Sequence, residues 1–243
     1  MNIFPRKTTQ NKHISFWKKI LYRSPGVLQR IAWIPGYFLI KVFLRFTVKG
    51  RENIKGLRGP VILALNHSSE WDPIVALGVL SPWSSILPMF YTARERKFYA
   101  KKGIGAFFYG GTFFKMWGAY PVGVGMRDYE QSLKPHIRIL EESRGSICIF
   151  PEGKKTSDGN IQEAKGGISF LLKRTGVPVI PISLQGHFAM PKTDFFLRRR
   201  KLVATVGKPI YQQDIFPDDV FITPDEHKRY AQEIMSRIAR LMV

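Results

Sequence analysis

Cysteine is almost absent from this chain of 243 residues, which contains only Cys148. A single cysteine excludes a disulfide framework within the chain and any zinc or iron–sulfur site built from several thiolates. Cys148 lies between Ile147 and Ile149. This setting is typical of a buried strand residue rather than a covalent nucleophile, because buried thiols are usually inert. The histidines form no cluster with metal-ligand spacing, so we expect no metal site.

Acidic residues are also scarce, since 18 Asp and Glu face 38 Lys and Arg, for a formal net charge of +20. The first 50 residues contain ten Lys or Arg and no acidic residue, with aromatic side chains such as Trp17, Trp33 and Phe38 between them. This mixture is typical of a segment lying on an anionic membrane surface. Two alternatives are a basic amphipathic helix packed on its own domain and a nucleic-acid contact, but no recognised nucleic-acid motif is found.

No long uninterrupted hydrophobic run is found, whereas a membrane-spanning helix needs about 20 apolar residues. Near the N-terminus the longest charge-free run, Ile31–Ile40, is interrupted by Pro35-Gly36, and the charge-free run Pro73–Ala93 contains further prolines and serines. No signal peptide is recognisable. We therefore expect residues 1–47 to form basic, aromatic-rich helices that associate with the cytoplasmic face of a membrane, peripherally or shallowly embedded.

From residue 48 onward the pattern alternates between apolar strands and amphipathic helices. Expected strands cover residues 60–66, 86–92, 119–122, 146–150, 179–184 and 202–206. Helices are expected from Asp72 as N-cap, over 128–143 with Pro135 as a kink or a later start, over 168–174 closed by Gly176, and after Thr223 in a capping box with Glu226. This alternation predicts an α/β domain over 48–212, a mostly parallel sheet flanked by helices, and a C-terminal helix within 213–243 packed on it.

The first candidate site is the stretch Asn66-His67-Ser68-Ser69-Glu70-Trp71-Asp72, which follows a predicted buried strand. Open α/β folds place catalytic groups at such strand ends. His67 and Asp72 can meet only if the residues between them form a turn. A carboxylate bonded to one imidazole nitrogen makes the other nitrogen a better base, so the pair predicts a general base. The alternative is a loop histidine followed by an ordinary N-cap.

The second candidate site is Phe150-Pro151-Glu152-Gly153-Lys154-Lys155-Thr156. It also leaves a strand end, so it should open onto the same edge of the sheet as His67. An acidic residue beside two lysines and a threonine suits a polar, phosphorylated substrate. The alternative is a surface turn whose lysines are solvated.

Together these stretches resemble the glycerolipid acyltransferase family, which includes the lysophosphatidate (1-acylglycerol-3-phosphate) acyltransferases. The Asn-His-x4-Asp and Phe-Pro-Glu-Gly motifs of that family match at Asn66–Asp72 and Phe150–Gly153, and its later apolar motifs match at Val177–Ile182 and Gly207–Ile210. The resemblance covers residues 48–212. It implies a membrane-associated enzyme of phospholipid biosynthesis that moves a fatty acyl group from acyl-CoA or acyl carrier protein to the hydroxyl of a lysophospholipid, by default 1-acylglycerol 3-phosphate, without a further cofactor.

The resemblance also implies roles for individual residues. His67 would be the general base and Asp72 would orient it, while backbone N–H groups near Gly153 would be candidate oxyanion donors. Substrate binding would fall to Glu152, Gly153, Arg127, Lys154 and Lys155. Two departures concern the acceptor headgroup: Lys-Lys replaces the usual Thr-Arg after Phe-Pro-Glu-Gly, and Arg127 comes later than the family's phosphate-binding arginine. The alternative function is a catalytically idle membrane-binding scaffold on the same fold.

Overall fold

The computed structural model describes residues 16–94, 112–123, 128–217 and 222–242. Its centre is a seven-stranded sheet with the order β1-β7-β6-β2-β5-β3-β4. Neighbouring strands are parallel except β6 and β7. The strands are β1 (Thr47–Lys49), β2 (Ile62–Leu65), β3 (Met89–Ala93), β4 (Ala119–Pro121), β5 (Ser146–Ile149), β6 (Val179–Gln185) and β7 (Val203–Val206).

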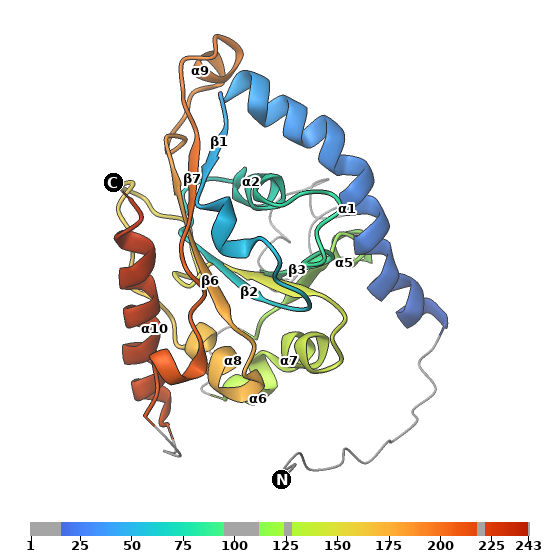
Figure 1. Cartoon of the computed structure of the whole chain (residues 1–243), viewed down its shortest axis with the longest axis vertical. Helices are drawn as coiled ribbons and strands as arrows, with labels where there is room; N and C mark the ends of the chain where they lie inside the picture. The colour runs from blue at the N-terminus through green and yellow to red at the C-terminus, as the bar shows by residue number, and fades with distance from the viewer. Residues whose placement is uncertain (1–15, 95–111, 124–127, 218–221, 243) are drawn as a thin grey trace.

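Helices cover both faces of this sheet, as Figure 1 shows. The first face carries α1 (Phe16–Phe43) and α2 (Asp72–Val79), and the second carries α7 (Lys134–Glu141), α8 (Gly167–Thr175) and α10 (Pro224–Ala239). Shorter helical segments are η1 (Arg51–Ile54), α5 (Thr112–Met116), α6 (Tyr129–Ser132), α9 (Lys192–Phe196) and η3 (Gln212–Asp214). The predicted α/β class, a mostly parallel sheet flanked by helices, is therefore confirmed.

Strand β2 is buried on both sides, as its uninterrupted apolar run predicts. Ile62 and Ala64 face the core under α8 and α10, whereas Leu63 and Leu65 face the core under α1 and α2. Its neighbours are β6 on one side and β5 on the other. The carboxyl ends of these three central strands therefore meet at one edge of the sheet.

The local helix signals were mostly correct, but one expected helix is divided in two and another begins one residue earlier than expected. Gly176 ends α8 in the left-handed conformation (φ 66°), and Thr223 and Glu226 form the expected capping box of α10. The helix expected over 128–143 is two helices, α6 and α7, because Pro135 in the first turn of α7 cannot supply a helical N–H donor. Helix α2 begins at Asp72 itself, so Trp71 rather than Asp72 is the N-cap.

Helix α1 continues through Pro25 and Pro35, so Pro35-Gly36 does not divide it. Among the described residues, no helix is both long and apolar enough to cross a membrane. Instead, one face of α1 packs on the domain. The Gln29 amide donates to Met89 O at 2.6 Å and accepts from Met89 N at 2.9 Å, and Trp33 Nε1 donates to Leu80 O at 2.9 Å. Side chains in the middle of α1 thus attach this helix to the α/β domain.

His136 on α7 makes stability pH-dependent, because its fully buried ring has a pKa lowered by desolvation to about 4, from 6.5. The unfolded chain binds this proton first as the pH falls. The stability contributed by the neutral ring is therefore complete above pH 6.5 and is lost as the pH falls to about 4, by roughly 3 kcal/mol. Urea unfolding at several pH values measures this loss. Between pH 6.5 and about 4 the free energy of unfolding should fall more steeply for the wild type than for a His136→Phe variant, and parallel curves of that free energy against pH would contradict the prediction.

Candidate active site

The predicted pair of His67 and Asp72 is formed. After β2 the chain turns so that the first residue of α2 faces back toward the strand end, and His67 Nδ1 lies 2.8 Å from Asp72 Oδ2. The backbone N–H groups of Ser68 and Ser69 donate to the same oxygen at 2.7 and 2.9 Å. Because an ionised carboxylate only accepts hydrogen bonds, the His67 proton sits on Nδ1 and Nε2 is free to act as a base.

Asn66 holds the start of this turn against the next strand. Its side-chain amide donates to Leu184 O at 3.0 Å and accepts from Leu184 N at 2.7 Å. This two-way bond continues the pairing of β2 with β6 past the last ladder residue. An asparagine at this position therefore fixes where His67 leaves the sheet.

A second histidine, not selected from the sequence, completes the environment of Asp72. His187 follows β6 and is almost fully buried, and its Nε2 hydrogen-bonds to Asp72 Oδ1. Burial by itself raises the pKa of the Asp72 carboxyl, but the hydrogen bonds from His187, His67 and the Ser69 backbone outweigh this and hold that pKa below its ordinary value. A histidine just beyond a neighbouring parallel strand is the sequence signal that could have revealed it.

The two predicted site motifs meet. The Phe150 ring stacks on the His67 ring with centroids 4.3 Å apart, and Thr156 N donates to His67 O at 2.8 Å. Glu152 is buried, and its Oε1 accepts from His67 N at 3.0 Å. Burial raises the pKa of Glu152, although backbone donors oppose the shift. The Phe-Pro-Glu-Gly turn therefore holds the backbone and the ring of His67 in place.

Gly153 is used mainly for the shape of this turn. It adopts a left-handed conformation (φ 69°), and its N–H donates to Phe150 O at 3.0 Å. That N–H closes the turn, and the oxyanion donors expected near Gly153 stay a prediction.

The predicted cations differ in their placement. Lys154 is exposed, Lys155 Nζ forms an ion pair with Glu70 Oε1 at 2.8 Å, and Arg127 lies outside the described residues. Arg94, which sequence reasoning missed, lies at the end of β3 and donates from Nη2 to Gly153 O at 3.2 Å. Its position two residues after the strand predicted over 86–92 is the signal that could have identified it.

Cys148 is fully buried in β5, and burial raises the pKa of its thiol well above the ordinary value, as suits a core residue. Among the residues that the structure describes, no group of three or more His, Cys, Asp or Glu side chains could hold a metal ion.

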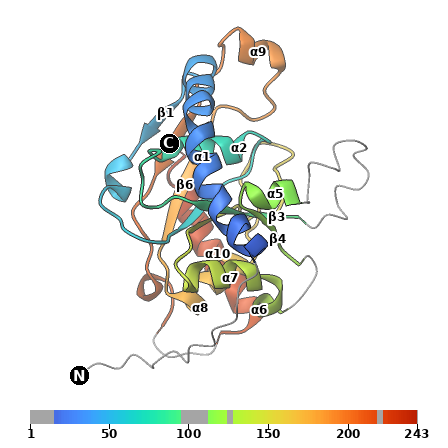
Figure 2. The same ribbon diagram turned by 90° about the vertical axis from the view of Figure 1, so that its right-hand side faces the viewer.

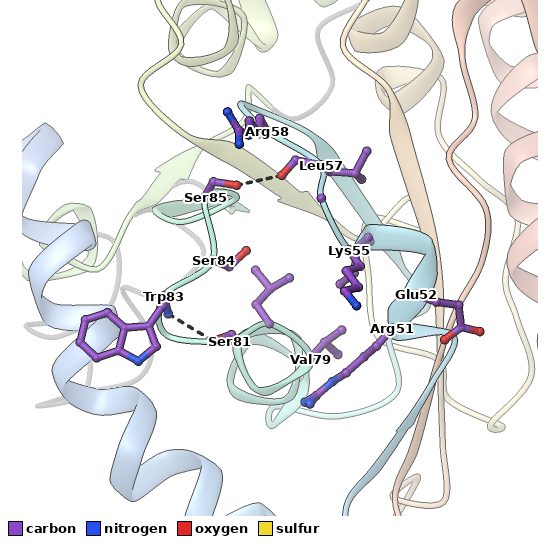
Figure 3. Close-up of a pocket in the computed structure, with 13 residues that line it drawn as sticks. Arg51, Glu52, Lys55, Leu57, Arg58, Val79, Ser81, Trp83, Ser84 and Ser85 are labelled. Atoms are coloured by element: carbon purple, nitrogen blue, oxygen red, sulfur yellow. Dashed lines mark hydrogen bonds between the residues drawn. The ribbon is translucent and has the colours of Figure 1, made fainter.

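A groove of about 530 Å³ lies at the opposite edge of the sheet, before β2 and after α2. Figure 3 shows Arg51, Lys55 and Arg58 around it, with Trp83 at its rim. None of the predicted site residues lines it. The groove is therefore separate from the His67 site.

Similar proteins are found among known acyltransferases. The family model described as Acyltransferase matches residues 45–185. A 1-acyl-sn-glycerol-3-phosphate acyltransferase of Pseudomonas aeruginosa is 21% identical over 199 residues, which are 81% of this chain and 71% of that protein. The chloroplastic 1-acyl-sn-glycerol-3-phosphate acyltransferase BAT2 of Brassica napus is 27% identical over 172 residues, which are 70% of this chain and 46% of that protein. The chain thus spans less than half the length of this plant relative.

The fold also has a solved counterpart. The crystal structure of the 1-acyl-sn-glycerophosphate acyltransferase PlsC from Thermotoga maritima matches with a TM-score of 0.57 and 20% sequence identity, covering 92% of this chain and 88% of that one. The family model itself covers more than half of this chain and includes both site motifs. This chain belongs to the acyltransferase family.

Proposed function

We propose that this protein transfers a fatty acyl group from an acyl thioester to the hydroxyl of a lysophospholipid, with 1-acylglycerol 3-phosphate as the acceptor. The observation that carries the proposal is the His67–Asp72 pair at 2.8 Å, which leaves His67 Nε2 free at the edge of the sheet. The relatives in the comparisons, which are named 1-acyl-sn-glycerol-3-phosphate acyltransferases, support the choice of acceptor.

In the proposed reaction, His67 Nε2 takes the proton of the acceptor hydroxyl while that oxygen attacks the thioester carbonyl carbon. The new C–O bond forms an ester as the C–S bond breaks, and the departing sulfur takes the proton from the imidazolium. Asp72 keeps the proton on Nδ1 and stabilises the transient positive ring. Glu152 positions His67 by accepting a hydrogen bond from its backbone N–H.

Arg94 and Lys154 are proposed to bind the acceptor phosphate beside the Phe-Pro-Glu-Gly turn, and Arg127 and Lys155 complete the proposed set. Lys155 already pairs with Glu70, and both side chains are exposed to solvent. Because an ion pair between exposed side chains contributes little free energy, a phosphate can replace Glu70 as the partner of Lys155. Arginine can in addition bind a phosphate through two hydrogen bonds.

Acyl transfer by the purified protein tests this function directly. The acceptors are 1-acylglycerol 3-phosphate, glycerol 3-phosphate and a lysolipid with an uncharged headgroup, each combined with acyl-CoA and with acyl carrier protein thioester. We expect transfer to 1-acylglycerol 3-phosphate to exceed that to the uncharged lysolipid. Absence of transfer to every acceptor would favour the alternative of an idle membrane-binding scaffold.

We further propose that the protein docks peripherally on an anionic membrane. The outer face of α1 exposes four large apolar side chains at helical spacing, with exposed fractions from 59 to 68%: Val27, Ile31, Ile34 and Phe38. Figure 2 shows α1 across the near side of the molecule, with α9 beyond its end. At α9, Phe196 and Leu197 are exposed beside the basic run 198–201. Apolar side chains next to cations suit the interface of an anionic bilayer.

Substituting Ile31→Glu and Ile34→Glu together should weaken binding to anionic phospholipid vesicles at least tenfold, since burial of each isoleucine contributes about 1.5–3 kcal/mol. Vesicle sedimentation measures the effect. The matched control is Lys208→Glu, which lowers the net charge equally but at an exposed position beyond the other end of β7. Equal binding by the two variants would contradict docking through α1.

A further inference from the structure

We propose that His187 is a positioning residue, which holds the Asp72 carboxylate so that the His67 proton stays on Nδ1. This role rests on the proposed function, in which His67 Nε2 accepts the proton of the acceptor. His187 does not touch the reacting atoms in this scheme. It acts on His67 only through Asp72.

The two oxygens of Asp72 have different partners within the described part of the chain. Oδ2 accepts from the His67 ring and from the backbone of Ser68 and Ser69. Oδ1 has one partner, the Nε2 of His187. Both side chains are fully buried. The second oxygen would thus lose its donor without His187, and water could not replace it freely.

In this position the Nε2 of the His187 ring faces Asp72 Oδ1 as a hydrogen-bond donor. Its Nδ1 is buried and has no hydrogen-bond partner among the described residues. A proton on Nδ1 would be an unsatisfied buried donor, which is costly, so the single proton of the neutral ring sits on Nε2 and points to Asp72. The Ser68 hydroxyl, 3.3 Å from the same nitrogen, is a weaker second contact.

The backbone before His187 is shaped for this contact. Gly186 adopts φ 99°, and a Cβ at this position would lie 2.0 Å from Lys201 O. Only glycine fits, and the sharp bend after β6 turns the next side chain toward α2. His187 and Asp72 are 115 positions apart and come from different elements.

The tautomer of the His67 ring depends on whether the Asp72 carboxylate can rotate. Rotation about the last aspartate side-chain bond has a broad energy minimum. With Oδ1 unpaired, Asp72 could turn from His67, and the ring could then place its proton on Nε2 instead. That tautomer cannot accept the proton of a hydroxyl. By bonding the second oxygen, His187 keeps the first one aimed at Nδ1.

Two matched amide substitutions separate this role from simple packing. In His187→Gln the side-chain nitrogen falls near the place of Nε2 and still reaches Asp72, whereas in His187→Asn it falls near the place of Nδ1 and does not. We expect His187→Asn to lower kcat about 10- to 100-fold, the effect of losing a hydrogen bond to a charged group, with KM little changed. His187→Gln should restore most of kcat.

A second readout needs no acyl transfer. In ¹⁵N-histidine-labelled protein without substrate, the ring shifts of His67, assigned with a His67→Ala variant, report its tautomer. We expect the Nδ1–H form alone in the wild type and in His187→Gln, and a mixture in His187→Asn. The same tautomer and the same kcat in both variants would overturn the proposal. If the tautomer changes as expected but the wild type transfers no acyl group, the positioning holds and the proposed function fails.

Discussion

Replacing His67 by alanine should lower kcat/KM for acyl transfer by about 10²- to 10⁴-fold, the range contributed by a positioned general base. His67 provides the free nitrogen of the pair, and the imidazole is about one-fifth exposed, so it can reach a bound substrate. Initial rates with 1-acylglycerol 3-phosphate and acyl-CoA or acyl carrier protein thioester measure the effect. The alanine variant should remain folded, because Asp72 Oδ2 keeps the Ser68 and Ser69 donors.

The control for this experiment is His13→Ala, which removes a histidine that belongs to neither motif. With the lipid acceptor presented in mixed micelles, we expect the acyl-transfer rate of this variant to equal that of the wild type. Thermal unfolding of both variants verifies that they are folded. Equal rates for the wild type and the His67→Ala protein would exclude His67 as the base.

Substitution of Asp72 by asparagine should lower both kcat for acyl transfer and the stability of the fold. Two ring nitrogens and two backbone N–H groups converge on this carboxylate. An asparagine has a single acceptor oxygen, and its NH₂ group must then face another donor. The His67 ring would be driven to its other tautomer, which in a comparable triad costs about 10⁴-fold in kcat. Each hydrogen bond to the charge that is lost also removes roughly 1.5–3 kcal/mol of stability.

This double effect distinguishes Asp72 from His67. We expect His67→Ala to lose activity and keep most of its stability, and Asp72→Asn to lose both in rate assays and urea unfolding. The stability difference between the wild type and Asp72→Asn should itself depend on pH. Because the folded pKa of Asp72 is lowered, its contribution is present above the ordinary value of 3.8 and is lost as the pH falls through the folded value. An Asp72→Asn protein as active as the wild type would refute the dyad.

Much of the fold was predictable because its signals act over a few residues. An apolar run marks β2, a left-handed glycine ends α8, and Thr223 with Glu226 caps α10. The helix expected over 128–143 is divided at a proline, where the pattern allowed either a kink or a later start. The continuity of α1 through two prolines was not predictable, because packing against β3 and α2 outweighs the local cost.

The candidate site was likewise predictable only in part. Both motifs were visible in the sequence, and their meeting followed from the rule that parallel strands end at one edge. The contacts that complete them were not predicted: His187 on Asp72, Arg94 on Gly153, and Glu70 on Lys155.

The sequence by itself determined the fold class, the family and the two residues of the proposed base, because these depend on short motifs and on hydrophobic periodicity. Only the tertiary structure decided which groups hold those residues in place. His187 reaches Asp72 because β6 lies beside β2, although the two residues are 115 positions apart in the chain. The choice of strand neighbours sums many weak contacts across the sheet, so no short stretch of sequence carries it.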